Sequence, residues 1–181
     1  MIDKVSVASR SPLLRKLEAL SQPLRIGLIG MGAMGKGLLY QCRATPGFRC
    51  VAVADLDVAK AAACAQSLGI PWRLVRDPAE MEDAIAKGQL AVCRDGMQVA
   101  TAGGVQVLIE SSSSIAEAGQ YCLAALDTGK NLVMMNAEAD LIFGPHLMRL
   151  AHTRGLVYTS CDGDQHGVIK HLVDDLELWG L

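Results

Sequence analysis

Short apolar runs alternate with amphipathic segments along almost the whole chain. Each apolar run is four to six residues long, which suits a strand that is covered on both faces. The segments between them carry apolar side chains three or four positions apart, which predicts helices. The expected strands cover residues 24–29, 49–54, 90–93, 105–110, 131–135 and 156–160. The expected helices cover residues 58–68, 78–88, 115–128, 145–154 and 168–178, and a further helix follows residues 30–35 and ends near residue 43.

This alternation predicts an α/β fold with a doubly wound, mostly parallel sheet. We expect a single domain of this kind at residues 23–165, because 181 residues only slightly exceed the size of an average domain. Residues 1–22 are an N-terminal extension, whose leucines at positions 13, 14, 17 and 20 predict a short amphipathic helix. Residues 166–181 are expected to form a helix that leads toward a C-terminal substrate domain outside this chain.

A glycine-rich segment follows the first expected strand and opens the next helix, with the pattern G-x-G-x-x-G. In a Rossmann fold this is the place of the dinucleotide-binding turn. The first glycine permits a tight turn, the second lets the backbone approach a pyrophosphate, and the third lets helix and strand pack closely. The two methionines are expected to pack beneath the turn. The residues predicted to hold the cofactor here are Gly30, Met31, Gly32, Ala33, Met34 and Gly35.

An acidic residue, Asp55, ends the second expected strand, 20 residues after Gly35. A carboxylate at this point hydrogen-bonds the ribose hydroxyls of a bound dinucleotide and repels a 2′-phosphate. No arginine immediately follows Asp55, and Lys60 is the nearest cation in the sequence. NAD(H) is therefore the favoured cofactor and NADP(H) a possible one. Two other interpretations stay open: a glycine turn that binds no nucleotide, and a turn that binds S-adenosylmethionine.

Polar side chains follow the later strands, at the edge where ligands of doubly wound folds bind. Ser111 and Ser112 are candidates for the nicotinamide ribose, although this segment also fits a helix cap formed by Ser114 with Glu117. Asn136 is a candidate cofactor contact. Glu138 is a candidate base, and equally a carboxylate that stabilises a helix start.

The segment after the last strand concentrates titratable groups. His166 is a candidate general acid or base, and Lys170 lies one helical turn later, where it supplies a positive charge. A structural loop and a solvated lysine are the alternatives. No metal site is predicted, because the spacing of the nearby aspartates and histidines matches no known ligand pattern.

Composition and charge exclude several classes of protein. The net charge is −2 and aromatic residues make up only 4% of the chain, so a nucleic-acid partner is not expected. No apolar run approaches the length of a membrane span. The six cysteines form no C-x-x-C pair, and no secretory signal is visible, so we expect a cytoplasmic protein. A small molecule is the expected substrate, and a homo-oligomer is possible.

Three stretches of the sequence resemble a known group of enzymes: LRIGLIGMGAMGKGLLYQ, VAVADLD and GKNLVMMNAEAD. They resemble the N-terminal domain of homoserine-dehydrogenase-like oxidoreductases. The nearest group carries a C-terminal SAF domain and includes enzymes similar to 1-deoxy-D-xylulose 5-phosphate reductoisomerases. The resemblance implies NAD(P)-dependent hydride transfer. Homoserine dehydrogenases have a lysine in a T-A-N-K-type segment, where this chain has Glu138, and the SAF-containing group resembles this chain at that position.

Three functions therefore remain open. The first is the cofactor domain of an oxidoreductase that moves a hydride between a nicotinamide and a small hydroxy or carbonyl substrate. The second is a dinucleotide-binding domain with a regulatory or assembly role and no catalysis. The third is a phosphosugar reductoisomerase-like activity that would need further parts of a longer protein.

Overall fold

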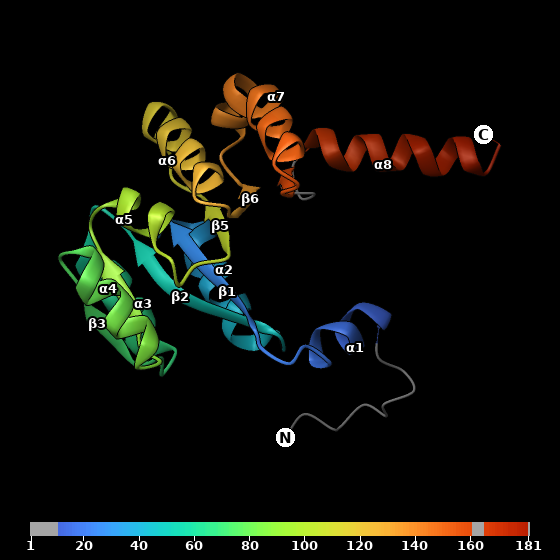
Figure 1. The fold of residues 1–181 in the computed structure, drawn as a ribbon. Coiled ribbons are helices and arrows are strands. Elements are labelled where there is room, and N and C mark those ends of the chain that lie inside the picture. Colours follow the sequence, from blue (N-terminus) through green and yellow to red (C-terminus); the bar gives the residue numbers. More distant parts are fainter. Residues whose placement is uncertain (1–10, 161–164, 181) are drawn as a thin grey trace.

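The apolar runs form the strands of one parallel sheet, as Figure 1 shows for a computed structural model of the chain. The structure describes residues 11–160 and 165–180. The seven strands pair in the order β3-β4-β2-β1-β5-β6-β7, and every pair is parallel. The strands are β1 (Leu24–Ile29), β2 (Phe48–Ala54), β3 (Trp72–Leu74), β4 (Leu90–Cys93), β5 (Val107–Glu110), β6 (Asn131–Met134) and β7 (Tyr158–Ser160).

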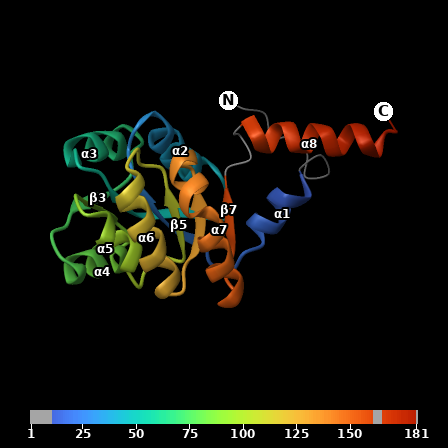
Figure 2. The ribbon, with the colours of Figure 1, turned by 90° about the horizontal axis from the view of Figure 1, so that it is seen from above.

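Helices cover both faces of this sheet, as Figure 2 shows from above. Side chains of α2 and α3 pack with one face of the sheet, and those of α4, α5, α6 and α7 pack with the other. In both views α8 extends away from the body formed by the sheet and its helices. The helices are α1 (Pro12–Glu18), α2 (Ala33–Ala44), α3 (Val58–Ser67), α4 (Pro78–Ala86), α5 (Gly96–Thr101), α6 (Ile115–Asp127), α7 (Ala137–Thr153) and α8 (Gln165–Leu178).

The predicted fold class is confirmed, and three details differ from the sequence prediction. The short edge strand β3 and the short helix α5 were not predicted. Helix α7 begins at Ala137, eight residues before the predicted start at Pro145. Asn136 caps this earlier start by accepting a hydrogen bond from the Ala139 N–H, and Pro145 lies inside the helix.

The two methionines of the glycine turn have different surroundings. Met31 is fully buried in the core cluster beside α2, as predicted. Met34 is 60% exposed, so the prediction that it packs beneath the turn is wrong. It is the second residue of α2, and its side chain lies on the solvent side of the helix.

No helix within the described parts of the chain is both long and apolar enough to cross a membrane.

Two glycines of α2 test how closely this helix approaches β1. A Cβ on Gly35 would lie 2.0 Å from the Gly30 carbonyl oxygen, so we expect Gly35→Ala to lower the free energy of unfolding by about 3 kcal/mol. A Cβ on Gly37 would meet nothing within 4 Å, and Gly37→Ala should raise stability by about 0.5–1 kcal/mol through helix propensity. Urea unfolding of both variants measures this. Equal effects of the two substitutions would contradict the close approach.

Candidate functional site

The carboxyl ends of the central strands meet at one edge of the sheet, and the glycine turn lies there. Gly30 directly follows β1 and has a φ angle of +93°, a conformation that side chains rarely permit. A Cβ on Gly30 would lie 2.7 Å from the backbone of Ser111 and Ser112, and the Gly35 Cβ would overlap Gly30. Both glycines are therefore required by the packing of the turn itself.

Gly32, the second glycine of the motif, is in a different situation. It is exposed, its φ angle is −65°, and a Cβ built on it would meet nothing within 4 Å. No contact with a described residue requires a glycine at this position. The open space above Gly32 is the space that a phosphate group needs when it approaches the backbone closely.

Helix α2 begins at this point without a capping side chain. Its N-cap residue is Gly32, and no side chain in the described part of the chain caps its first turn with a hydrogen bond. Asp57, Asp77 and Asp95, by contrast, cap α3, α4 and α5 with their carboxylates. The N-terminus of α2 therefore offers uncapped N–H groups and the positive end of the helix dipole to an anion.

The Asp55 carboxylate lies beside this turn and is bonded to it. Its Oδ2 accepts a hydrogen bond from the Met31 N–H at 2.6 Å, and its Oδ1 accepts one from the Asp57 N–H at 2.8 Å. The side chain is only half-buried, and each oxygen keeps a second lone pair. Asp55 can therefore hold the turn and still accept ribose hydroxyls.

The sheet also brings Arg94 next to Asp55, which the sequence analysis missed. Ala54 on β2 is the register partner of Cys93 on β4, and the Asp55 N–H donates to the Cys93 carbonyl at 3.1 Å. Arg94 is the next residue, exposed, and without a hydrogen bond or ion pair to any described residue. Strand pairing places this arginine beside Asp55 from 39 positions further along the chain, a proximity that the residues directly after Asp55 do not reveal.

The serines after β5 brace the turn. The Ser111 hydroxyl lies 2.9 Å from the Ile29 carbonyl and 3.0 Å from the Gly30 carbonyl, to which it donates. The Ser112 hydroxyl accepts a hydrogen bond from the Ser114 N–H. Ser114 is the N-cap residue of α6, as predicted, but its hydroxyl bonds the Glu117 carboxylate rather than the helix backbone. Ser111 thus ties β5 to the end of β1, and Ser112 remains partly exposed.

A buried carboxylate, Glu110, lies at the end of β5 and was not predicted as a site residue. It has no solvent exposure, its Oε1 accepts the Ser112 N–H at 3.0 Å, and its Oε2 has no partner. Burial raises the pKa of Glu110, and contacts with Ser112 and Asn136 oppose this rise. The feature of the sequence that could have indicated Glu110 as a site residue is its position at the end of a central strand.

Asn136 and Glu138 lie at the start of α7, on the same edge. The Asn136 amide is buried and donates to the Ser114 carbonyl at 2.9 Å, while its oxygen caps α7. Its polar atoms are thus engaged within the chain. Glu138 is exposed and lines an open groove of about 690 Å³ between α7 and β7.

This groove joins polar groups to an apolar wall. Tyr158 on β7 donates its hydroxyl hydrogen bond to Asp140 on α7. Burial raises the pKa of Tyr158, and the Asp140 carboxylate raises it further. The groove is also lined by Leu141, Pro145 and Met148. Its composition suits a small molecule that carries both hydroxyl groups and carbon surface.

The remaining candidates fall at the border of the described structure. His166 and Lys170 belong to α8, but their side chains lie outside the described residues, as do Cys161, Asp162 and Asp164. Among the residues that are described, no cluster of three or more histidines, cysteines or carboxylates could hold a metal ion.

Solved structures with the same arrangement of elements are numerous. Myo-inositol dehydrogenase from Lactobacillus casei, solved with NAD(H) and myo-inositol, superposes with a TM-score of 0.63 at 21% identity, over 87% of this chain and 42% of that one. A homoserine dehydrogenase from Thiobacillus denitrificans gives 0.59 at 20% identity, over 77% and 29%. Biliverdin reductase from Synechocystis sp. PCC 6803, solved with biliverdin and NADP+, gives 0.59 at 17% identity, over 77% and 38%.

The chain has the Rossmann fold. The identities of these three structures are too low to show more than the fold. No family model matches the sequence, and no curated protein matches it. The chain spans 29%, 38% and 42% of the lengths of the three Rossmann-fold proteins named above, so their substrate specificities do not transfer with the fold.

The buried Glu110 makes a pH-dependent contribution to stability. Its raised pKa means that ionisation of the carboxyl group is disfavoured in the folded state. Below pH 4.5 the group is neutral and does not lower the stability of the fold. As pH rises through the raised pKa, the stability falls because the buried group becomes charged. We expect Glu110→Gln to become more stable than the wild type as pH increases from 4 to 8.

Glu117 provides the matched control with the opposite sign. Its pKa is lowered, chiefly by the Ser114 hydroxyl, so its contribution is present at neutral pH and is lost as pH falls. Glu117→Gln should therefore be slightly less stable than the wild type at pH 7 and equal to it in acid. Urea unfolding across this pH range measures both. Parallel pH profiles for wild type and Glu110→Gln would refute the assignment to Glu110.

Proposed function

We propose that this chain is the NAD(P)-binding domain of an oxidoreductase. The observation that carries the proposal is the open space above Gly32 at the uncapped start of α2. Packing accounts for Gly30 and Gly35, whereas a ligand that approaches the backbone closely accounts for a glycine at position 32. A pyrophosphate is the ligand whose charge and approach fit this end of the helix.

The rest of the dinucleotide follows from the order of the strands. Asp55 at the end of β2 receives the adenosine ribose. The nicotinamide end extends toward β5 and β6, where Ser112 is partly exposed and Glu138 is exposed. When bound there, a nicotinamide supplies a site that accepts or donates a hydride. The chain's contribution is to hold that ring at the edge of the groove between α7 and β7.

The substrate class is a small hydroxy or carbonyl compound. The similar solved structures include enzymes named for homoserine, inositols and biliverdin, which supports this class without selecting one member. A homoserine-dehydrogenase-like role and membership of the SAF-containing group are the finer forms of the proposal. In both of these finer proposals, Glu138, His166 and Lys170 would serve the reaction. The protein would act in the cytoplasm, and a second copy of the chain is a possible partner.

A dinucleotide-binding domain without catalysis is the second candidate. The observation in its favour is that two predicted site residues, Ser111 and Asn136, have their polar side-chain atoms bonded within the chain. A phosphosugar reductoisomerase-like activity of a longer protein is a weaker third possibility, since no described feature other than the groove speaks for it.

The cofactor preference follows from Asp55 and Arg94. We expect Asp55→Asn to weaken NADH binding about tenfold, because a charged acceptor of ribose hydroxyls is lost, and to reduce the disadvantage of NADPH. Arg94→Gln should weaken NADPH about tenfold and leave NADH within about twofold, since only NADPH carries a 2′-phosphate with which a guanidinium beside Asp55 can pair.

Isothermal titration calorimetry of wild type and both variants with each nucleotide measures these effects. Arg76→Gln, an exposed arginine before α4, serves as the charge-matched control and should change neither affinity. Equal losses of NADH and NADPH binding in Arg94→Gln would contradict its assignment to the 2′-phosphate. Failure of both nucleotides to bind the wild type would overturn the proposed function.

Turnover separates the catalytic from the non-catalytic candidate. NAD+ and NADP+ reduction by the chain is followed at 340 nm with a panel that contains homoserine, myo-inositol and simple secondary alcohols. We expect the chain to reduce the cofactor with at least one compound of the panel. In Glu138→Gln the rate of this reduction should fall at least about tenfold, with the cofactor affinity unchanged. Binding of cofactor without reduction by any compound would favour the non-catalytic domain.

A further inference from the structure

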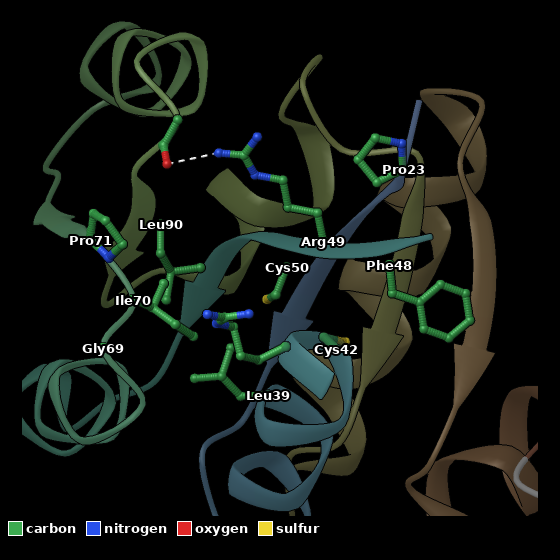
Figure 3. A pocket seen from close by; sticks show the side chains of 12 residues that line it. Pro23, Leu39, Cys42, Phe48, Arg49, Cys50, Gly69, Ile70, Pro71 and Leu90 are labelled. Atoms are coloured by element: carbon green, nitrogen blue, oxygen red, sulfur yellow. Dashed lines mark hydrogen bonds between the residues drawn. The ribbon is translucent and has the colours of Figure 1, made fainter. Parts of the chain in front are cut away.

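A second cavity lies at the opposite edge of the sheet from the glycine turn. It has a volume of about 330 Å³, at the lower end of the range for small-molecule sites. The amino-terminal ends of β2 and β4 contribute to it, together with the end of α2 and the loops before β1, β3 and β4. Figure 3 shows the side chains that line it. The site proposed for the dinucleotide shares none of these residues.

The described residues that line this cavity give it a positive charge. Two of its twelve lining residues are arginines, Arg43 and Arg49, and none of the twelve is an acid. The Arg43 side chain has no hydrogen bond or ion pair within the described chain. Arg49 donates one hydrogen bond to the Gly88 carbonyl at 2.8 Å, which fixes its guanidinium at the rim and leaves its other N–H groups available.

The interior of the cavity is apolar and neutral. Leu39 and Leu90 are buried in the core cluster below it, and Ile70 packs against that cluster. Two thiols complete this surface. Burial raises the pKa of Cys42 to about 11 and that of Cys50 well above its ordinary value, so both are uncharged at pH 7. No negative charge from the thiols therefore offsets the two guanidinium groups.

We propose that this cavity binds a small organic anion, a carboxylate with a short apolar body. Its charged group pairs with Arg43, which has no other partner, while Arg49 adds a second positive charge at the rim. Its apolar body lies against Phe48, Ile70 and Pro71, which line the cavity and keep accessible surface. Such a ligand matches the cavity in charge, size and polarity, and a neutral compound of the same shape matches it only in part.

Hexanoate and hexan-1-ol are a matched pair of probes for this site. Amide chemical shifts of the uniformly 15N-labelled chain are followed during titration with each compound. We expect hexanoate to shift the signals of Gly69, Ile70 and Gly88 and to bind at least about tenfold more tightly than hexan-1-ol. Arg43→Gln should weaken hexanoate about tenfold and Arg49→Gln about threefold, with hexan-1-ol unchanged in both.

Arg76→Gln, which removes an arginine outside the cavity, is the control and should leave hexanoate binding unchanged. Equal affinities for hexanoate and hexan-1-ol would overturn the proposal, as would shifts confined to other parts of the chain or unaltered binding in Arg43→Gln. Saturating NADH should not change the hexanoate affinity, because the two sites share no residue. The hexanoate titration therefore tests the anion site independently of the proposed cofactor binding.

Discussion

The close contact between the start of α2 and the end of β1 is the constraint on which the rest of the structure depends. Gly35 lies so near the Gly30 carbonyl that no side chain fits between them. Because of this contact, the axis of α2 starts directly above the carboxyl end of the central strand. The N–H groups of its first turn, which no side chain caps, then face the edge of the sheet.

Neighbouring strands fix this turn from both sides. The Asp55 carboxylate bonds the Met31 N–H from β2, and the Ser111 hydroxyl bonds the carbonyls of Ile29 and Gly30 from β5. We propose one of these residues, Asp55, as a dinucleotide contact as well. The turn is thus held in shape before any ligand binds, which reduces the ordering that binding would otherwise require.

The fold could be predicted largely from the sequence, since buried parallel strands leave continuous apolar runs and the glycine pattern marks the first crossover. Strand β3 and helix α5 were missed because each is only three to six residues long and carries little periodic pattern. The start of α7 was missed because Pro145 is a common first helical residue, whereas here tertiary packing and the Asn136 cap extend the helix past it.

The site was predictable only where it is local in sequence. The glycine motif and Asp55 follow a fixed spacing along the chain, so it could be inferred that Asp55 lies beside the glycine turn. Arg94 and Tyr158 depend on strand pairing, because each lies beside its neighbour only after β4 and β7 have joined the sheet. Glu110 bonds the nearby Ser112 N–H, but its complete burial also depends on the assembled sheet and helices. Ser111 and Asn136 were identified by position, but the structure shows their polar atoms bonded to the protein's own backbone.

Calorimetric titration of Gly32→Ala with NADH tests the central claim most directly. Since a Cβ at this position meets no described residue within 4 Å, the variant should stay folded and lose only about 0.5–1 kcal/mol, the cost of alanine in place of glycine at an N-cap. Its NADH affinity should fall at least about tenfold, because the methyl group occupies the space that the pyrophosphate needs. A stable Gly32→Ala variant that binds NADH as tightly as the wild type would contradict the assignment of this turn to a dinucleotide.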